Sequence, residues 1–234
     1  MSLLARLFQR GPDLAPDLAQ RLEAWRGRPA VNLEAGFEAA RYVVVDVEST
    51  GLDLNKDRLI AIGAVAVEGG NIVLADSFEA VLRQEQASAK DNILVHGIGG
   101  EAQREGIPPA EALLAFLDYL GKSPLVAFHV TFDETMIKRA MRTYLNLDFK
   151  HPWVDLAYVL PGLLPEYARR YRALDHWSGH FDISNFARHS ALADALATAQ
   201  LLQCVLKRAP AKNARNYKHL LNLEQAQRWV SWSN

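Results

Sequence analysis

The chain has 234 residues, of which 50% are hydrophobic and 23% are charged, and its formal net charge at pH 7 is −1. Such a composition is typical of a folded globular protein and excludes a disordered or low-complexity chain. The sequence also lacks the strongly basic balance that indicates nucleic-acid binding by a whole surface. Any nucleic-acid partner must therefore be held by a local site.

Cysteine content and hydropathy bear on the cellular compartment. Cys204 is the single cysteine, so no intramolecular disulfide can form, which fits a reducing cytoplasm of the bacterial type. The sequence has no apolar run of the roughly 18 residues that a membrane-spanning helix requires, and its N-terminus lacks a signal-peptide pattern. We therefore predict a cytoplasmic protein with no membrane partner.

The N-terminal part contains two segments with helical patterns, Ser2–Arg10 and Pro16–Arg26, which a Gly-Pro pair separates. The second segment repeats apolar residues at helical spacing, in Leu18, Leu22 and Trp25. This stripe favours a helix that packs on the main domain. The alternative is an arm that docks a partner, such as a polymerase.

The stretch from Arg41 to Asp53 reads RYVVVDVESTGLD and predicts a buried strand that ends in a turn. Because side chains alternate along a strand, Asp46 and Glu48 point to the same face. Two carboxylates this close repel each other unless a cation lies between them, so the pair indicates a divalent metal site. Thr50 and Gly51 then form a turn whose backbone N–H groups could face a ligand. On its own the pair is weak evidence, since many strand ends carry solvated acids.

The next two segments, Arg58–Glu68 and Asn71–Arg83, are apolar and β-rich, and they flank a Gly-Gly-Asn turn. This pattern predicts a hairpin, so the domain opens with three antiparallel strands in a meander. An α/β fold follows, with a mixed sheet flanked by helices. The later predicted elements are a helix at Ala110–Leu120, a strand at Pro124–Phe128, a helix at Thr131–Tyr144, a strand leading into a helix at Val154–Leu160, and helices at Leu164–Leu174 with a basic face, Ala191–Lys207 and Pro210–Asn234.

Two more acidic residues stand at positions that need an explanation. Asp133 lies in the first turn of a predicted helix, where a carboxylate is often only a favourable partner of the helix dipole. Asp194 lies among apolar residues of the long late helix, five positions after His189, and a buried carboxylate there is costly without a partner. Together with the pair on the first strand, these acids offer oxygen ligands only, which suit Mg²⁺ or Mn²⁺ rather than zinc.

Three short motifs, taken in order, give the chain a resemblance to a known family. The first reads Asp-x-Glu-x-Thr-Gly, the second is Phe-Asp at a helix start, and the third is His-x-Ala-x-x-Asp-Ala. The matching residues are Asp46, Glu48, Thr50, Gly51, Phe132, Asp133, His189, Ala191, Asp194 and Ala195. Over about residues 41–208 the chain resembles the DnaQ-like 3′–5′ exonucleases of the histidine-bearing DEDDh branch, which includes proofreading subunits of bacterial replicative polymerases.

This resemblance implies a ribonuclease-H-like fold with a mixed five-stranded sheet. Residues 1–40 would then form an N-terminal helical extension, and residues 209–234 a C-terminal helical tail. It also implies that two Mg²⁺ or Mn²⁺ ions are held by four carboxylates, those of Asp46, Glu48, Asp133 and Asp194. His189 would serve as the general base in phosphodiester hydrolysis.

By the same resemblance, the 3′ end of the substrate would bind beside the first two motifs. The backbone near Glu48 and Thr50 would receive the terminal hydroxyl, with Gly51 as a further substrate contact in the same turn. Phe132, or an apolar neighbour such as Leu52, would pack on the last nucleotide. One position departs from the family pattern, because His129 stands where an asparagine is usual. Histidine can still donate a hydrogen bond, so we expect an altered substrate preference rather than lost activity.

The predicted function is a metal-dependent 3′–5′ exonuclease that converts single-stranded or frayed DNA to 5′-mononucleotides. Single strands are favoured because the terminal base must leave its stack to reach the metals. Two alternatives stay open. One is an RNA-trimming enzyme similar to oligoribonucleases, because residues that read the sugar lie outside the motifs. The other is a non-catalytic adaptor that binds a polymerase through the N-terminal helices. A free-standing nuclease for DNA repair or nucleic-acid turnover is favoured over a proofreading subunit in DNA replication, although the sequence does not decide whether the protein proofreads for a polymerase.

Overall fold

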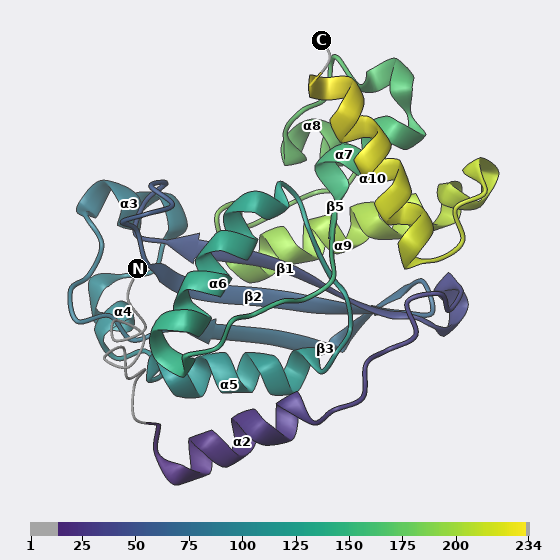
Figure 1. Cartoon of the computed structure of the whole chain (residues 1–234). Helices are drawn as coiled ribbons and strands as arrows, with labels where there is room; N and C mark the ends of the chain where they lie inside the picture. Colours follow the sequence, from purple (N-terminus) through teal and green to yellow (C-terminus); the bar gives the residue numbers. More distant parts are fainter. Residues whose placement is uncertain (1–13, 233–234) are drawn as a thin grey trace.

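The computed structural model describes residues 14–232, so the predicted helix Ser2–Arg10 lies outside the described residues. A five-stranded sheet in the order β3-β2-β1-β4-β5 forms its centre (Figure 1). β1, β2 and β3 pair antiparallel, whereas β4 and β5 run parallel to β1, which confirms the predicted mixed sheet and its meander. The strands are β1 (Arg41–Ser49), β2 (Leu59–Glu68), β3 (Asn71–Val81), β4 (Leu125–Ala127) and β5 (Trp153–Asp155).

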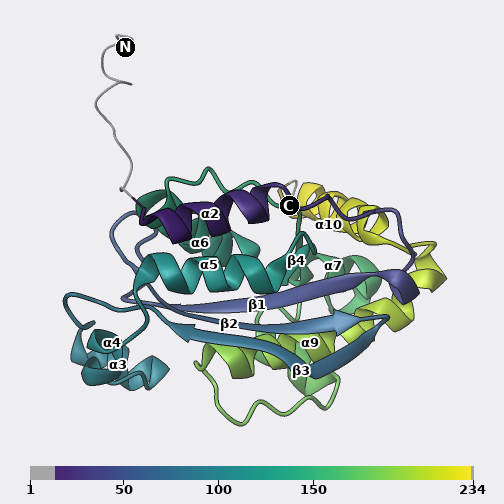
Figure 2. The ribbon, with the colours of Figure 1, turned by 90° about the horizontal axis from the view of Figure 1, so that it is seen from below.

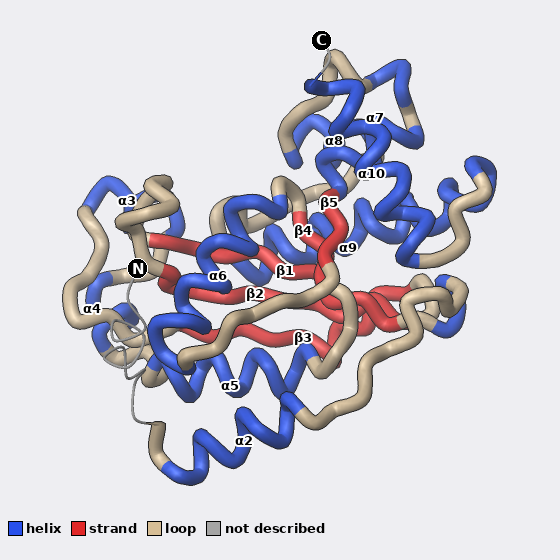
Figure 3. Tube along the Cα trace, viewed as in Figure 1, coloured by secondary structure: helices blue, strands red, loops and turns tan. Residues whose placement is uncertain are grey.

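Helices cover both faces of the sheet, as Figure 2 shows. On one face lie α2 (Pro16–Arg26), α5 (Pro109–Leu120) and α6 (Val130–Leu145), and on the other lies α9 (Ala191–Arg208). The other helices, blue in Figure 3, are α3 (Lys90–His96), α4 (Gly100–Arg104), α7 (Leu156–Leu163), α8 (Leu174–His180) and α10 (Tyr217–Trp232). Within residues 14–232, no helix combines the length and the apolar character that crossing a membrane requires.

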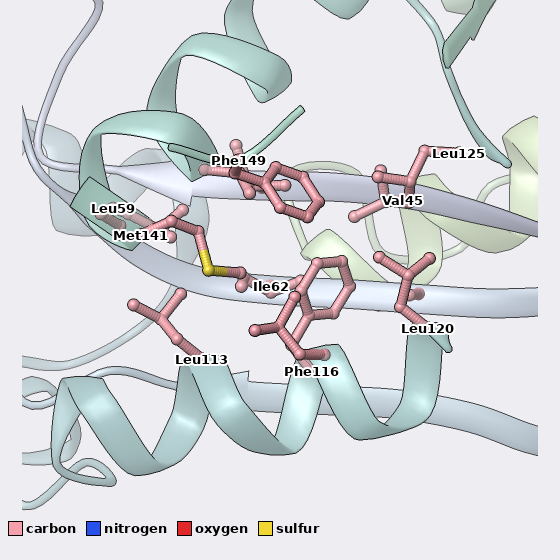
Figure 4. Close-up of a cluster of buried hydrophobic side chains, with 14 of the residues drawn as sticks. Val45, Leu59, Ile62, Leu113, Phe116, Leu120, Leu125, Met141 and Phe149 are labelled. Atoms are coloured by element: carbon pink, nitrogen blue, oxygen red, sulfur yellow. The ribbon is translucent and has the colours of Figure 1, made fainter. Parts of the chain in front are cut away.

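The main core lies between the sheet and the helices α5 and α6. Val45 and Ile62 of the sheet meet Leu113 and Phe116 of α5 and Met141 of α6 (Figure 4). Full burial of each such side chain stabilises the fold by about 1.5–3 kcal/mol. A second core lies on the opposite face, where α7, α9 and α10 contribute its apolar residues. The two cores hold β1 from both sides.

Helix α2 packs against α5 through its apolar stripe. Leu22 and Trp25 are buried in the main core, and the Trp25 Nε1–H donates to the carbonyl oxygen of Gly121 at 2.7 Å. The face that might have docked a partner is therefore covered by the domain itself. The structure supports the packing interpretation of this helix.

Side chains of β1 alternate between the two cores. The valines at positions 43, 45 and 47 join the main core, and Tyr42 and Val44 join the second. Asp46 and Glu48 continue the second series, so both point to the face that α9 covers. This confirms the prediction that they share one face.

A glycine in β2 lets α9 approach this face closely. Gly63 pairs in register with Asp46 of β1. A Cβ atom on Gly63 would lie 2.2 Å from the backbone carbonyl carbon of Ala191 and from the backbone nitrogen of Leu192. Only a residue without a side chain allows the backbone of α9 to lie this close to the sheet. The contact places the first turn of α9, with Asp194, beside β1.

The predicted helix Leu164–Leu174 is wrong. The structure has a single 3₁₀ turn at Pro165–Tyr167, and α8 begins where the predicted helix was to end. The proline ring disfavours helical geometry in the residue before it, and Leu164 accordingly has φ −126° and ψ 66°. The predicted basic face therefore becomes an irregular segment, residues 164–173, with three exposed arginines: Arg169, Arg170 and Arg172.

The predicted C-terminal helix Pro210–Asn234 begins later than expected. A 3₁₀ turn at Ala209–Lys212 is followed by Asn213, whose left-handed backbone (φ 60°) ends the helical path. α10 then starts at Tyr217 and packs on α7 and β5. The Tyr217 hydroxyl donates to the carbonyl oxygen of Trp153 at 3.1 Å, which fixes the start of α10 on the domain.

We expect Gly63→Ala to lower both the stability and the Mn²⁺ affinity of the protein. The new methyl group must push the backbone of α9 away from the sheet, which costs about 1–3 kcal/mol and separates Asp194 from β1. Urea unfolding and Mn²⁺ titration measure the two effects. Gly179→Ala is the matched control, because a Cβ atom there meets nothing within 4 Å. Unchanged metal affinity in Gly63→Ala would show that this contact does not position Asp194.

Candidate active site

Three carboxylates from distant parts of the chain meet on the face of β1 that α9 covers. Oxygen atoms of Asp46, Glu48 and Asp194 all lie within 4.8 Å of one another. Two of these residues come from β1, and Asp194 comes from the first turn of α9. Asp194 is buried, whereas the other two are partly exposed, so the cluster opens to solvent on the β1 side. The structure thus brings the first and third motifs together.

Asp133, from the second motif, lies beside this cluster. It sits in the first turn of α6 and is only 4% exposed. Burial raises the pKa of Asp133, although the backbone N–H groups of Asp133 itself and of Val47 oppose the rise. After burial, the charge of Asp133 is the strongest influence that raises the pKa of Asp46. Asp133 is therefore an electrostatic neighbour of the cluster but is not one of the three residues with mutually close oxygens.

The two carboxylates of β1 retain protons more readily than isolated acids do. Burial raises the pKa of Asp46 well above its usual value, and the neighbouring carboxylates raise it further. Burial and the charge of Asp194 raise the pKa of Glu48 to about 8. A divalent cation would relieve the same repulsion, and a donor set of oxygen atoms suits Mg²⁺ or Mn²⁺. The residues present therefore fit the predicted metal ions.

The Asp194 carboxylate receives three donors from the loop before α9. Asn185 Nδ2 donates to Oδ1, while Arg188 Nη1 (2.5 Å) and the His189 backbone N–H (3.0 Å) donate to Oδ2. Arg188 Nε also donates to Asp175 Oδ1 at 2.7 Å. The Arg188 cation opposes the pKa rises of the β1 carboxylates. Sequence analysis singled out neither Asn185 nor Arg188. The sequence feature that could have indicated Arg188 is its position directly before the third motif.

His189 is exposed and has an unusual backbone conformation. Its φ of 64° lies in the left-handed region, which non-glycine residues adopt uncommonly and which is enriched at functional sites. The hydrogen bond from its N–H to Asp194 holds this conformation. His189 therefore stands next to the carboxylate cluster with its side chain accessible to solvent.

Both backbone and side-chain hydrogen bonds hold the turn after β1. The Thr50 N–H donates to the carbonyl oxygen of Arg58 at 2.9 Å, and the Thr50 hydroxyl donates to Asp57 Oδ1 at 2.8 Å. A Cβ atom on Gly51 would lie 2.5 Å from Asp57 Oδ2, so the glycine makes room for that carboxylate. Thr50 and Gly51 thus shape the loop that presents Leu52, whose side chain is 86% exposed.

The two remaining predicted contact residues lie at the start of α6. His129 also has a left-handed backbone (φ 67°), and its N–H donates to Asp155 Oδ1 at 3.0 Å. Its ring Nε2 lies 3.1 Å from the carbonyl oxygen of Arg172, an acceptor, so Nε2 carries the proton. Phe132 is partly buried against the main core. The His129 side chain is therefore tied to the irregular segment.

Comparison with known proteins now places this site in a family. Residues 43–202 match the RNase T family model, which is described as "Exonuclease", and this range contains all three motifs. The chain belongs to the DnaQ-like exonuclease family. Membership confirms the resemblance drawn from the motifs, and the five-stranded sheet and its strand order are those of this family's ribonuclease-H-like fold.

Among its relatives are the enzymes named DNA polymerase III PolC-type. The protein of Thermotoga maritima is 32% identical over 168 residues, which cover 72% of this chain and 12% of that protein. The protein of Bacillus subtilis is 31% identical over 185 residues, which cover 79% of this chain and 13% of that protein. This exonuclease-family chain therefore spans about an eighth of the length of these relatives.

Solved structures with the same fold include nucleases bound to DNA. Escherichia coli exonuclease I in complex with a dT13 oligonucleotide aligns with a TM-score of 0.59 and 19% identity, over 74% of this chain and 42% of that chain. Exonuclease X in complex with 5′ overhanging duplex DNA aligns with a TM-score of 0.60 and 16% identity, over 78% of this chain and 99% of that chain. At these identities the likeness shows a shared fold.

We expect the protein in chelator to lose stability as the pH rises from about 5 to about 8. The pKa of Glu48 is about 8 in the fold against an ordinary 4.5, so between these values the folded state binds more protons than the unfolded state. The free energy of unfolding therefore falls as the pH rises. Thermal unfolding across this range measures the slope, and added Mg²⁺ should raise Tm most at the upper end.

Glu48→Gln is the matched variant for this experiment, because glutamine has the same shape and cannot ionise. Its unfolding temperature should depend less on pH than that of the wild type. Comparing the two proteins isolates Glu48 from the other titrating groups. Equal slopes in both would show that Glu48 does not carry a raised pKa.

Proposed function

We propose that this protein is a metal-dependent 3′–5′ exonuclease that shortens single-stranded or frayed DNA to 5′-mononucleotides. The observation that carries the proposal is the convergence of Asp46, Glu48 and Asp194, whose oxygens lie within 4.8 Å of one another. The buried Asp133 adjoins these three residues. The exposed His189 lies in the loop before α9 and donates its backbone N–H to Asp194. Membership in the exonuclease family supports this assignment of the cluster.

In this proposal the carboxylates hold two divalent cations, Mg²⁺ or Mn²⁺. The charges of all three other acids act on Asp46, which would contribute to both ions. Glu48 and Asp194 would hold one ion, and Asp133 would help to hold the other. When bound, the cations supply Lewis-acid activation of the phosphodiester and stabilise negative charge on the attacking and leaving oxygens. The repulsion that raises the pKa of Asp46 and Glu48 supports such a role.

His189 acts as the general base in the proposed reaction. It would accept a proton from the attacking water, a role that histidine takes in general acid–base catalysis. Its N–H bond to Asp194 anchors the residue beside the cluster, while its accessible side chain can reach solvent and substrate. The left-handed backbone at this position supports a functional constraint, because such strain persists where the surroundings enforce it.

The end of the substrate strand would bind between the turn after β1 and the start of α6. Leu52 presents an exposed apolar surface there, and Phe132 lies near Asp133 on the first turn of α6. Apolar and aromatic side chains are suited to pack on an unstacked terminal base. His129 is tied to the carbonyl of Arg172, so we propose that it shapes this end of the site and alters substrate preference.

DNA is the proposed substrate, and the relatives support it. Their names identify DNA polymerases, and the two nucleases described above, which share the fold, were solved with DNA bound. The catalytic domain would span residues 41–208. An RNA-trimming enzyme and a non-catalytic adaptor become outcomes of the experiment below.

The wild-type protein should shorten 5′-labelled single-stranded DNA from its 3′ end in Mg²⁺ or Mn²⁺, and a chelator should stop the reaction. Asp46→Asn should lower the rate to background without lowering Tm, because it removes one of the mutually repelling charges. Asp148→Asn is the control, since this exposed acid pairs with Lys150. Faster cleavage of RNA of the same sequence would favour the RNA enzyme. No cleavage of either strand would favour the adaptor.

His189→Asn should slow hydrolysis by about 10²–10⁴-fold, the usual contribution of a general base. Asparagine tolerates the left-handed backbone at this position but cannot act as the base. Mn²⁺ affinity, measured by calorimetry, should stay close to that of the wild type, because the carboxylates remain. His219→Asn on α10 is the control. A His189→Asn variant with normal turnover would remove His189 from the mechanism.

A further inference from the structure

A buried carboxylate outside the three motifs supports the start of α6. Asp155 ends β5 and is 1% exposed. Its Oδ1 accepts the backbone N–H groups of His129 and Ala157, each at 3.0 Å. Its Oδ2 accepts the N–H of Val130 at 3.2 Å and the Arg228 guanidinium at 2.9 Å. Both oxygens of Asp155 are therefore fully engaged.

Two of these donors belong to the first residues of α6. His129 is the N-cap residue with a left-handed backbone, and Val130 is the first residue of the helix. The Asp155 carboxylate therefore satisfies backbone N–H groups that the helix itself leaves unpaired. Asp133 follows within the same first turn. The orientation of that turn toward β1 thus depends on where Asp155 holds it.

The charged partner of Asp155 comes from the C-terminal helix. Arg228 of α10 donates through Nη2 to Asp155 and through Nε to Glu224 Oε1, both at 2.9 Å. Glu224 Oε2 in turn accepts the Asp155 backbone N–H at 2.8 Å. The guanidinium also lies over the Tyr158 ring of α7, 4.0 Å from its centroid. Two residues of α10 therefore bind Asp155: Glu224 binds its backbone N–H, and Arg228 binds its side chain.

The charge of Arg228 matters because Asp155 is buried. Burial raises the pKa of Asp155, and the Ala157 N–H and the Arg228 cation oppose the rise. An ionised carboxylate can accept at all its lone pairs, whereas a protonated one must turn a donor toward its neighbours. Among the described residues, Arg228 supplies the one ion pair to Asp155 through Nη2, and its Nε pairs with Glu224, so the guanidinium bridges the two carboxylates.

We propose that Arg228 is a positioning residue of the active site, which acts through Asp155 to fix the first turn of α6 and hence Asp133. Arg228 lies beyond residues 43–202, the range that the family model matches. The C-terminal helix is then part of the catalytic apparatus of this chain and not a packing element alone. The role given to Asp133 rests on the proposed function, whereas the support of α6 does not.

The test compares Arg228→Gln with the wild type and with Lys218→Gln. Lys218 is the matched control, because it is a cation on the same helix whose salt bridge to Glu34 is exposed. Three quantities are measured in each protein: hydrogen exchange of the amides at residues 129–133, the Mn²⁺ concentration for half-maximal activity, and KM for single-stranded DNA. Hydrogen exchange requires no activity, so it tests the support of α6 even if the exonuclease assignment fails.

In Arg228→Gln we expect faster exchange at residues 129–133 and a Mn²⁺ midpoint raised about 10–100-fold, the usual effect of removing a group that orients metal ligands. KM for DNA should change little, and Lys218→Gln should match the wild type. Wild-type exchange and a wild-type midpoint in a folded Arg228→Gln protein would overturn the proposal. A wild-type protein without exonuclease activity would instead refute the proposed function.

A second variant separates positioning from stability. Arg228→Gln leaves a buried carboxylate without its cation and lowers stability, whereas Asp155→Asn/Arg228→Gln removes that charge as well. The double variant should regain Tm yet keep fast exchange at residues 129–133, because the asparagine amide cannot accept at both of its ends. If exchange and the Mn²⁺ midpoint recover together with Tm, Arg228 has a merely structural role and the proposal is wrong.

Discussion

The candidate active site depends on one close contact between two backbones. Where the start of α9 touches β2 at Gly63, a side chain of any size would separate helix from sheet. The residue opposite Gly63 in the sheet is Asp46, so the same contact that packs the helix also brings Asp194 to the carboxylates of β1. Packing geometry thus forces together charges that would otherwise separate, and the apolar cores on both faces of β1 supply the stability that holds them.

Cations and hydrogen-bond donors around the site stabilise its buried carboxylates. Arg188 and Asn185 hold Asp194 from the loop side, and Arg228 holds Asp155 from the C-terminal helix. Two histidines with a left-handed backbone lie beside these networks. His129 directly precedes α6, and His189 lies in the loop before α9. A left-handed backbone and a buried carboxylate therefore coincide at two loop-to-helix junctions, the starts of α6 and α9.

The strands and helices that could be predicted from the sequence are those marked by a pattern of neighbouring residues. Runs of β-branched residues predicted the meander, and apolar spacing predicted α2, α5, α6 and α9 within a few residues. The helix expected at 164–174 was wrong because one proline outweighed the pattern, and α4 has no apolar period over its 5 residues. The partners of Asp155 and Asp194 could not be predicted, since no local pattern says which arginine a buried carboxylate will meet. Gly63 did leave a signal, as a lone glycine within a strand pattern.

The pairing of Asp155 with Arg228 also bears on how the protein is made. These residues are 73 positions apart, so during synthesis β5 and its carboxylate leave the ribosome well before their cation does. Until Arg228 has been synthesised, the charge of the Asp155 carboxylate, which supports the start of α6, is not balanced by this cation. The nascent chain therefore acquires a fully ordered second motif only after α10 has been translated as well.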